Sequence, residues 1–259
     1  MPRYGSFRAD FDRIVGSERP VALARFHDGE YHVLEGLPYN ARSGWHLRKP
    51  SWLRERLDSA LRADLEGMWV GISPPCDWPV GTSYYRKRVK AAKVTFATLF
   101  WHSNYARFKK ALDHELAGAA LVTCGKGDYK VPANGVAKEW DLDALVDELL
   151  EEERTILVAA GPCACVIVHE YWKRQDPDKR VSILDVGASL DPKVLGKRTR
   201  HYQEASQDGR ALRGHTCDWK TTVPWSSAAA PKKAEKVRGW RAKKAGKRKY
   251  PQPKGKPKS

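Results

Sequence analysis

The stretch Ala22-Leu-Ala-Arg-Phe-His-Asp-Gly-Glu30 joins a short apolar run to two carboxylates that are separated by one glycine. An apolar run that stops at a polar, glycine-containing turn is typical of a buried strand that delivers side chains to its C-terminal end. Ligands bind at that edge in open α/β sheets. We therefore expect residues 21–26 to form a strand and Asp28 and Glu30 to lie on the loop after it.

Asp28 and Glu30 have a spacing that lets two carboxylates on a loop face one hard cation, Mn²⁺ or Mg²⁺, which keeps part of its shell for substrate phosphates. Arg25 adds a positive charge beside them. A charged turn on a solvated surface would show the same residues, so both interpretations stay open. His27 and His32 also suggest zinc or iron, but zinc sites usually use closer histidines or thiolates, and we favour Mn²⁺ or Mg²⁺.

The remaining pattern predicts an α/β protein. Further strands are expected at residues 68–72, 93–100, 119–124, 155–160 and 181–187. Helices are expected at residues 6–17, 51–61, 108–115, 141–153 and 163–175, with an irregular segment at 37–49. A strand–helix–strand unit such as the last one implies a parallel pair with a right-handed crossover. The predicted fold class is a Rossmann-like, doubly wound, mostly parallel sheet.

A second candidate site is the glycine turn Ala160-Gly-Pro-Cys-Ala164, where a predicted strand runs into a helix. Unpaired amides at a helix N-terminus can bind an anion, although a tight turn without a ligand explains the residues equally well. Asp185 and Gly187 end the next strand, and Asp185 could orient a sugar or nucleotide hydroxyl or cap the following turn. The basic run Lys197-Arg-Thr-Arg-His201 could neutralise a diphosphate or be a solvated charge run.

The positive charge is concentrated at the C-terminus. The formal net charge of the chain is +16, of which residues 232–259 supply +12 from 13 Lys and Arg and one Glu. We predict a folded domain at residues 1–203, an extension and linker at 204–231, and a disordered Lys/Arg-rich tail at 232–259. The tail suits DNA or RNA binding, and a solubilising end or attraction to an acidic membrane surface are alternatives.

The cysteines and the hydropathy pattern indicate the compartment. The five Cys residues form no CxxC pair, and the N-terminus shows no apolar signal-peptide region. No apolar run approaches the roughly 18 residues that a membrane span needs. We expect a cytoplasmic protein, in a bacterial cell or a phage-infected host, with no transmembrane segment.

Several of these segments resemble one known family. The run Ala24-Arg-Phe-His-Asp-Gly-Glu30 resembles the R-F-x-D-G-E signature of the GT-D-type glycosyltransferases, a bacterial family first catalogued as a domain of unknown function. Four further segments come in that family's order and at similar spacing, and the resemblance covers about residues 20–202. They are Trp69-Val-Gly-Ile-Ser, Val131-Pro-Ala-Asn-Gly-Val-Ala, Ile156-Leu-Val-Ala-Ala-Gly-Pro-Cys-Ala and Ile183-Leu-Asp-Val-Gly-Ala.

The resemblance implies transfer of a sugar from a nucleotide sugar, typically a UDP-sugar, with a divalent cation. It implies that Asp28 and Glu30 hold Mn²⁺ or Mg²⁺ against the donor diphosphate and that Arg25 belongs to the catalytic set. The matched segments imply donor-binding residues at Gly161, Pro162, Asp185, Gly187 and Asn134. Where the family often reads Asp-Ile-Gly-His, this chain has Asp185-Val-Gly-Ala188, so no general base is assigned.

The sequence thus predicts a metal-dependent glycosyltransferase whose acceptor is a surface glycan or, because of the basic tail, DNA with modified bases. The main alternative is a nucleic-acid-binding protein that has lost catalysis on a Rossmann-like core. The two carboxylates, Arg25 and the two glycine turns count against it, since a pure binder needs none of them. A Rossmann methyltransferase is a weaker option, because its usual glycine-rich loop after the first strand is replaced here by an acidic one.

Overall fold

The computed structural model describes residues 7–40, 46–48, 51–74, 78–101, 104–200 and 203. The chain divides into two compact units, residues 1–220 and 221–259, and every described residue belongs to the first. The predicted linker at 204–231 and tail at 232–259 lie outside the described residues, so their boundaries stay predictions. No helix in the described part of the chain is long and apolar enough to cross a membrane.

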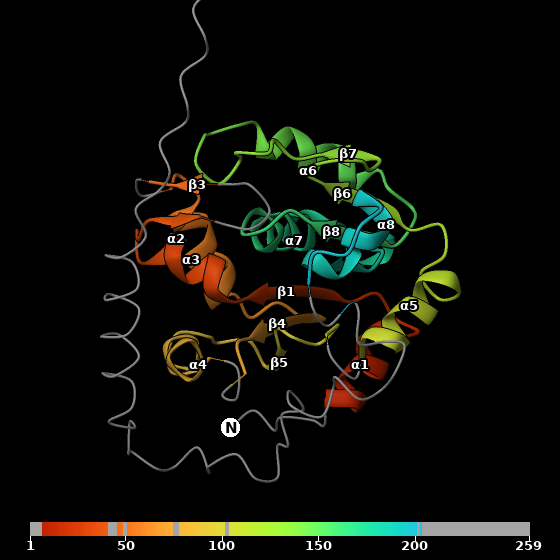
Figure 1. The fold of residues 1–259 in the computed structure, drawn as a ribbon. Helices are drawn as coiled ribbons and strands as arrows, with labels where there is room; N and C mark the ends of the chain where they lie inside the picture. Colours follow the sequence, from red (N-terminus) through yellow and green to blue (C-terminus); the bar gives the residue numbers. More distant parts are fainter. Residues whose placement is uncertain are drawn as a thin grey trace, which may run out of the picture. The chain divides into compact units, whose positions relative to one another are not determined.

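A seven-stranded sheet forms the centre of the first unit, and all its strand pairings are parallel (Figure 1). Its strand order is β5-β4-β1-β9-β8-β6-β7. The strands are β1 (Ala22–Phe26), β4 (Met68–Ile72), β5 (Lys93–Phe96), β6 (Ala120–Thr123), β7 (Tyr129–Lys130), β8 (Ile156–Ala159) and β9 (Ile183–Asp185). A separate antiparallel hairpin joins β2 (Tyr39–Asn40) to β3 (His46–Leu47).

The direction of the crossovers decides which face each helix covers. The connections β1 to β4, β4 to β5, β6 to β8 and β8 to β9 all step the same way across the sheet, so right-handed crossovers put their helices on one face. These helices are α2 (Asp28–Leu34), α3 (Arg54–Arg62), α4 (Pro79–Arg86), α6 (Leu142–Leu150) and α7 (Cys163–Arg174). The opposite face carries α1 (Phe7–Val15), α5 (Tyr105–Asp113) and α8 (Asp191–Leu195).

Side chains alternate between the two faces of the buried strands. On β1, Leu23 belongs to the apolar cluster under α1 and α5, together with Leu157 and Leu184 from neighbouring strands. Ala22 and Ala24 are fully buried and, by the period of two along a strand, face the side on which α7 packs against β1. Burial on both faces explains why the strands read as continuous apolar runs.

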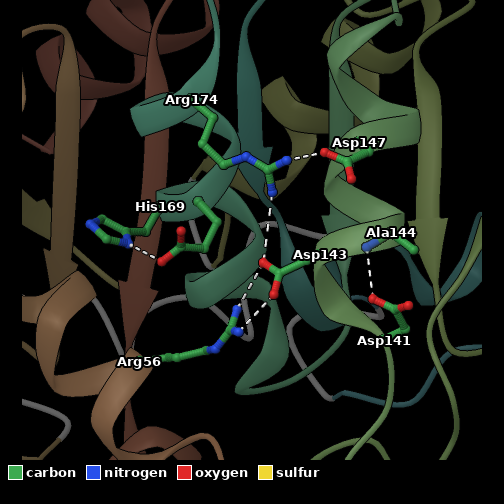
Figure 2. A network of polar contacts seen from close by, with 8 residues as sticks. Arg56, Asp141, Asp143, Ala144, Asp147, His169 and Arg174 are labelled. Atoms are coloured by element: carbon green, nitrogen blue, oxygen red, sulfur yellow. Dashed lines mark hydrogen bonds and ion pairs between the residues drawn. The ribbon is translucent and has the colours of Figure 1, made fainter.

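Ion pairs join three of the helices, α3, α6 and α7, that cover the same face of the sheet (Figure 2). The guanidinium of Arg56 on α3 donates two hydrogen bonds, of 3.1 and 2.8 Å, to the carboxylate of Asp143 on α6. Arg174 on α7 lies 3.7 Å from the same carboxylate and also pairs with Asp147. Asp141 caps α6 by accepting the Ala144 N–H at 2.9 Å. These half-exposed pairs contribute little stability individually, but they connect α3, α6 and α7.

The predicted fold class is confirmed, and four local predictions are wrong. Residues 28–30 are the first turn of α2 and not a loop, and the segment expected to be irregular contains the β2–β3 hairpin. The helix expected from residue 51 begins at Arg54, because the Ser51 hydroxyl donates to the Val136 carbonyl and accepts the Leu53 N–H. The strand expected to reach residue 100 ends at Phe96.

The backbone at Gly67 gives a test of the packing beneath α7. Gly67 has a φ of +79°, and a β-carbon there would lie 2.8 Å from the buried indole of Trp172. Gly118 has a φ of +74° with no atom within 4 Å of its β-carbon position. We expect Gly118→Ala to cost about 1 kcal/mol, and Gly67→Ala about 1–3 kcal/mol more, in urea unfolding. Equal losses would show that Trp172 adjusts freely.

Candidate functional site

Because the sheet is parallel, its C-terminal edge gathers the residues that the sequence singled out. Asp28 follows β1, Gly161 follows β8, and Asp185 ends β9, and these three strands are neighbours. Gly187 lies in the turn directly after β9. The structure therefore brings most of the predicted site to one edge, where ligands bind in open α/β sheets.

Asp28 is the exposed carboxylate of this edge. Its Oδ1 accepts the Gly29 N–H at 3.0 Å and lies 3.1 Å from Nδ1 of His27, while its Oδ2 accepts the Tyr39 hydroxyl at 2.7 Å. Burial acts to raise its pKa, but His27, Tyr39 and the Gly29 amide together hold the pKa of Asp28 well below its usual range. Asp28 is therefore ionised at neutral pH, and its side chain is 52% exposed.

Glu30 lies in a different environment, although only one residue separates it from Asp28. Its side chain reaches back to the start of α2, where Oε2 accepts the His27 N–H at 2.7 Å. The residue is 7% exposed, and burial raises the pKa of Glu30 to about 7, with the charges of Asp185 and Asp28 adding to the effect. Glu30 caps the helix, which is why α2 begins at Asp28. The acidic first turn was the signal for this helix start.

Arg25 and Asp185 form a buried ion pair. Nη2 of Arg25 donates to Oδ1 of Asp185 at 3.1 Å, its backbone N–H donates to Oδ2 at 3.3 Å, and Nη1 donates to the Ala97 carbonyl at 2.8 Å. Burial raises the pKa of Asp185, and the Arg25 guanidinium opposes that shift. A β-carbon on Gly187, whose φ is +48°, would lie 2.2 Å from Nη2. The structure shows these two charges paired with each other. The predicted catalytic role of Arg25 and the predicted role of Asp185 in binding the sugar donor therefore stay predictions.

A cavity of about 310 Å³ opens over the C-terminal ends of β6 and β8. It is lined by Thr123, Cys124, Gly125, Ala133, Ala159, Gly161, Asp191, Val194, Leu195, Lys197, Thr199 and Arg200. Gly161 has a φ of +54°, which favours glycine, and Pro162 is the N-cap of α7. Asn134 is exposed on the loop beside Ala133, and its carbonyl accepts the N–H groups of Ala137 and Lys138. The cavity thus combines cations, a glycine turn and a helix start.

Arg200 connects this cavity to the surroundings of Asp28. Burial raises the pKa of Tyr39, which donates to Asp28, and also that of Asp191 in the cavity wall. The Arg200 guanidinium acts in the opposite direction on both groups, so its charge is felt on both sides. The predicted basic run therefore contributes at least one cation to the edge that carries the carboxylates.

Aromatic rings border Asp28 on the side of β4 and β5, and the sequence prediction missed them. Tyr31 packs edge-on against Trp78 at 5.0 Å and Tyr84 at 4.8 Å, and His27 lies 5.4 Å from Trp101, as centroid distances. All five residues are partly exposed. Trp78 and Trp101 follow the ends of β4 and β5 in the chain, which was the available signal. Partly exposed aromatic rings suit contact with sugar rings or bases.

A larger hollow lies at the opposite edge of the sheet. It has a volume of about 900 Å³ and is bordered by residues at the N-terminal ends of the strands, including Val21, Gly67 and Lys93, and by Arg180. None of the predicted site residues lines it. We place the candidate site at the carboxylate edge, because that edge has the charged and glycine-turn residues suited to a phosphorylated ligand.

No three His, Cys, Asp or Glu side chains are grouped as metal ligands within the described residues. His27 lies against Asp28, and His32 stacks on Tyr39 at 4.4 Å, so the zinc or iron alternative gains no support. A Mg²⁺ or Mn²⁺ ion that arrives with substrate phosphates needs only one or two protein carboxylates. The ionised, half-exposed Asp28 fits such an ion.

Comparisons with known proteins address the fold. No protein-family model and no curated protein matches the sequence. The chain is similar to a solved structure described as a new glycosyltransferase, with domain of unknown function 1792, from Streptococcus sanguinis. The identity is 14%, the alignment covers 80% of this chain and 92% of the other, and the TM-score is 0.50. At this identity the likeness shows the fold, which is an α/β glycosyltransferase-like fold.

Two further solved structures of domain of unknown function 1792 match with TM-scores of 0.45. One is a selenomethionine form with 14% identity that covers 77% of this chain and 85% of the other. The second is described as having a distinct glycosyltransferase fold, with 15% identity and coverage of 78% and 93%.

The buried ion pair predicts a strong asymmetry between single and double variants. Asp185→Ala leaves the Arg25 guanidinium buried without its partner and should cost about 3–5 kcal/mol in denaturant unfolding. The double variant Arg25→Met, Asp185→Leu should recover part of that loss, because it removes both charges. Asp58→Ala, which breaks an exposed pair with Arg62, is the control and should cost under about 1 kcal/mol. A cost for Asp185→Ala no greater than this would contradict the prediction.

Glu30 predicts a pH-dependent stability. Because burial raises the pKa of Glu30 to about 7 in the folded protein, the unfolded chain loses this proton at a lower pH than the folded protein does. The folded protein therefore loses stability as the pH rises from the ordinary pKa of a glutamate to about 7, and it loses none below that range. Glu30→Gln removes the charge, so we expect it to stabilise the protein by on the order of 3 kcal/mol at pH 8 and little at pH 4.5. Urea unfolding in EDTA measures this. Glu35→Gln, at the end of the same helix, is the control, and a difference independent of pH would oppose the prediction.

Proposed function

We propose that this protein is a metal-dependent glycosyltransferase that moves a sugar from a nucleotide sugar, a UDP-sugar, to a hydroxyl acceptor. The observation that carries the proposal is an ionised, half-exposed Asp28 at the same sheet edge as a cavity lined by Lys197, Arg200 and Gly161. The glycosyltransferase-like fold supports the same reaction class. The edge thus offers the charges that a nucleotide diphosphate and its metal ion require, with cations in the cavity and an anionic carboxylate after β1.

The cavity would take the nucleotide diphosphate of the donor. Lys197 and Arg200 can pair with phosphate oxygens, and the turn at Gly161 and Pro162 leads into the N-terminus of the 12-residue helix α7. Val194 and Leu195 give the cavity an apolar wall. Asn134 would reach the donor from the adjoining loop, and Asp185 and Gly187 border the sugar side.

The Asp28–Glu30 turn would hold Mn²⁺ or Mg²⁺. Such an ion, when bound, would stabilise the negative charge that develops on the departing diphosphate. Tyr39 and His27 hold the Asp28 carboxylate by hydrogen bonds and thus orient it toward a ligand at the sheet edge. Arg25 would act on the same edge through its charge, although its guanidinium lies against Asp185.

The acceptor would approach from the aromatic side of Asp28, formed by Tyr31, Trp78, Tyr84 and Trp101. We propose a glycan, or DNA with modified bases that the basic residues 232–259 attract, as the acceptor class. A nucleic-acid-binding protein without catalysis remains the second candidate, and the +12 charge of those residues favours it. The two candidates differ in whether a donor sugar is released.

Donor hydrolysis tests the proposal directly. Purified protein, a panel of nucleotide sugars and Mn²⁺ should release the nucleotide from one donor, and EDTA should stop the release. Asp28→Ala should lower turnover by at least about 100-fold with unchanged folding, because it removes the metal ligand from a site of charge stabilisation. Asp58→Ala, another exposed aspartate, should keep full turnover. Normal turnover of the Asp28→Ala variant would contradict the proposed role of the Asp28–Glu30 turn in holding the metal ion.

Donor binding can be followed without turnover. Cys124 is exposed and lines the cavity, whereas Cys163 and Cys165 are buried. UDP with Mn²⁺ should slow alkylation of Cys124, measured on its peptide by mass spectrometry. If neither protection nor donor hydrolysis occurs while the protein binds DNA, the non-catalytic candidate is correct.

A further inference from the structure

The two carboxylates of the Asp28–Glu30 turn do not share one environment. Asp28, the first residue of α2, has a side chain that is 52% exposed, whereas Glu30 is 7% exposed. Residues two apart on a helix do not face each other. One carboxylate therefore faces the solvent at the sheet edge, and the other is turned back into the protein.

Both backbone polar groups of His27 have partners that fix this peptide. Its N–H donates to Oε2 of Glu30 at 2.7 Å, and its carbonyl accepts the hydroxyl of the buried Tyr85 and the N–H of Tyr31. Its ring lies 3.1 Å from Oδ1 of Asp28. The orientation of the Asp28 side chain thus depends on the position of His27. Glu30 fixes that position by accepting the hydrogen bond from the His27 backbone N–H.

We propose that Asp28 alone of the two carboxylates contacts the divalent cation, and that Glu30 is a positioning residue that acts through the His27 peptide. The inference rests on the proposed function and divides its metal pair into two roles. If Glu30 turned outward to the cation, the His27 N–H would lose its acceptor in a part-buried position, where an unmade hydrogen bond is costly. One carboxylate and the donor phosphates are sufficient protein and substrate ligands for Mg²⁺ or Mn²⁺.

Glutamine distinguishes the two roles at position 30. A capping box accepts Glu or Gln at this helix position, so Glu30→Gln keeps an acceptor for the His27 N–H but loses the anionic oxygen that a metal prefers. Glu30→Ala loses both. Asp28→Asn removes the charge of the proposed ligand with little change in shape.

The readout is Mn²⁺ binding in the presence of UDP, measured by electron paramagnetic resonance on the full chain without a sugar. We expect Asp28→Asn to abolish measurable binding and Glu30→Ala to weaken it about 10–100-fold, as loss of an outer-shell partner does. Glu30→Gln should stay within about threefold of wild type, so that glutamine rescues what alanine loses. Glu35→Gln, at the C-cap of α2, controls for the loss of one negative charge near this helix.

A folded Glu30→Gln protein that binds Mn²⁺ as poorly as Asp28→Asn would overturn the inference, because the anionic oxygen would then be needed. If Glu30→Ala does not fold by circular dichroism, the glutamine variant decides alone. If wild-type protein binds no Mn²⁺ with UDP, the cation of the proposed function fails and the inference fails with it. Protection of Cys124 by UDP then shows whether the donor site survives, which separates this failure from a failure of the whole proposal.

Discussion

The ion pair between Arg25 and Asp185 joins two strands that are neighbours in the sheet and 160 residues apart in the chain. A guanidinium buried at the end of β1 is tolerated only with a partner that satisfies its charge, and Asp185 on β9 supplies it. The close approach requires Gly187, which has no β-carbon to meet Arg25. A buried pair adds little net stability, but it favours one arrangement of these strands, and that arrangement determines the site.

With β9 beside β1, the edge of the sheet becomes an ordered series of chemical environments. The cavity with Lys197 and Arg200 lies over β6 and β8, the carboxylates follow β1 and β9, and the aromatic rings around Trp78 follow β4 and β5. The order suits a transfer reaction, because a diphosphate, a cation and an acceptor would be lined up along one edge. Of the three carboxyl groups at this edge, Asp28, Glu30 and Asp185, Arg25 pairs with Asp185 alone. The edge therefore keeps a negative charge that a divalent cation would neutralise.

Helix α7 connects the core to this edge. It packs against β1, and the thiol of Cys165 donates to the Arg25 carbonyl at 3.1 Å. Its C-terminal end is joined to α6 through the ion pairs of Arg174 with Asp143 and Asp147. The same helix begins at the Gly161 turn, so the packing of the whole α7 face sets where that turn lies relative to Asp28. The apolar surface of α7 thus serves the site as well as the core.

The sequence by itself determined six of the seven strands of the sheet, α7 and the edge at which Asp28 and Gly161 lie, because apolar runs and glycine turns are local patterns and parallel strands end on the same side. It did not indicate the two-residue strand β7. It could not determine the pairing of Arg25 with Asp185, since that depends on which strands become neighbours over a long separation. It also could not show that Asp28 and Glu30 have different environments, because two residues with this sequence spacing can lie on a loop or on a helix. Only the tertiary structure decided that the Asp28 carboxylate is exposed and that the Glu30 carboxylate is buried and caps α2. The physical reason is that burial depends on the strands and helices packed around each side chain.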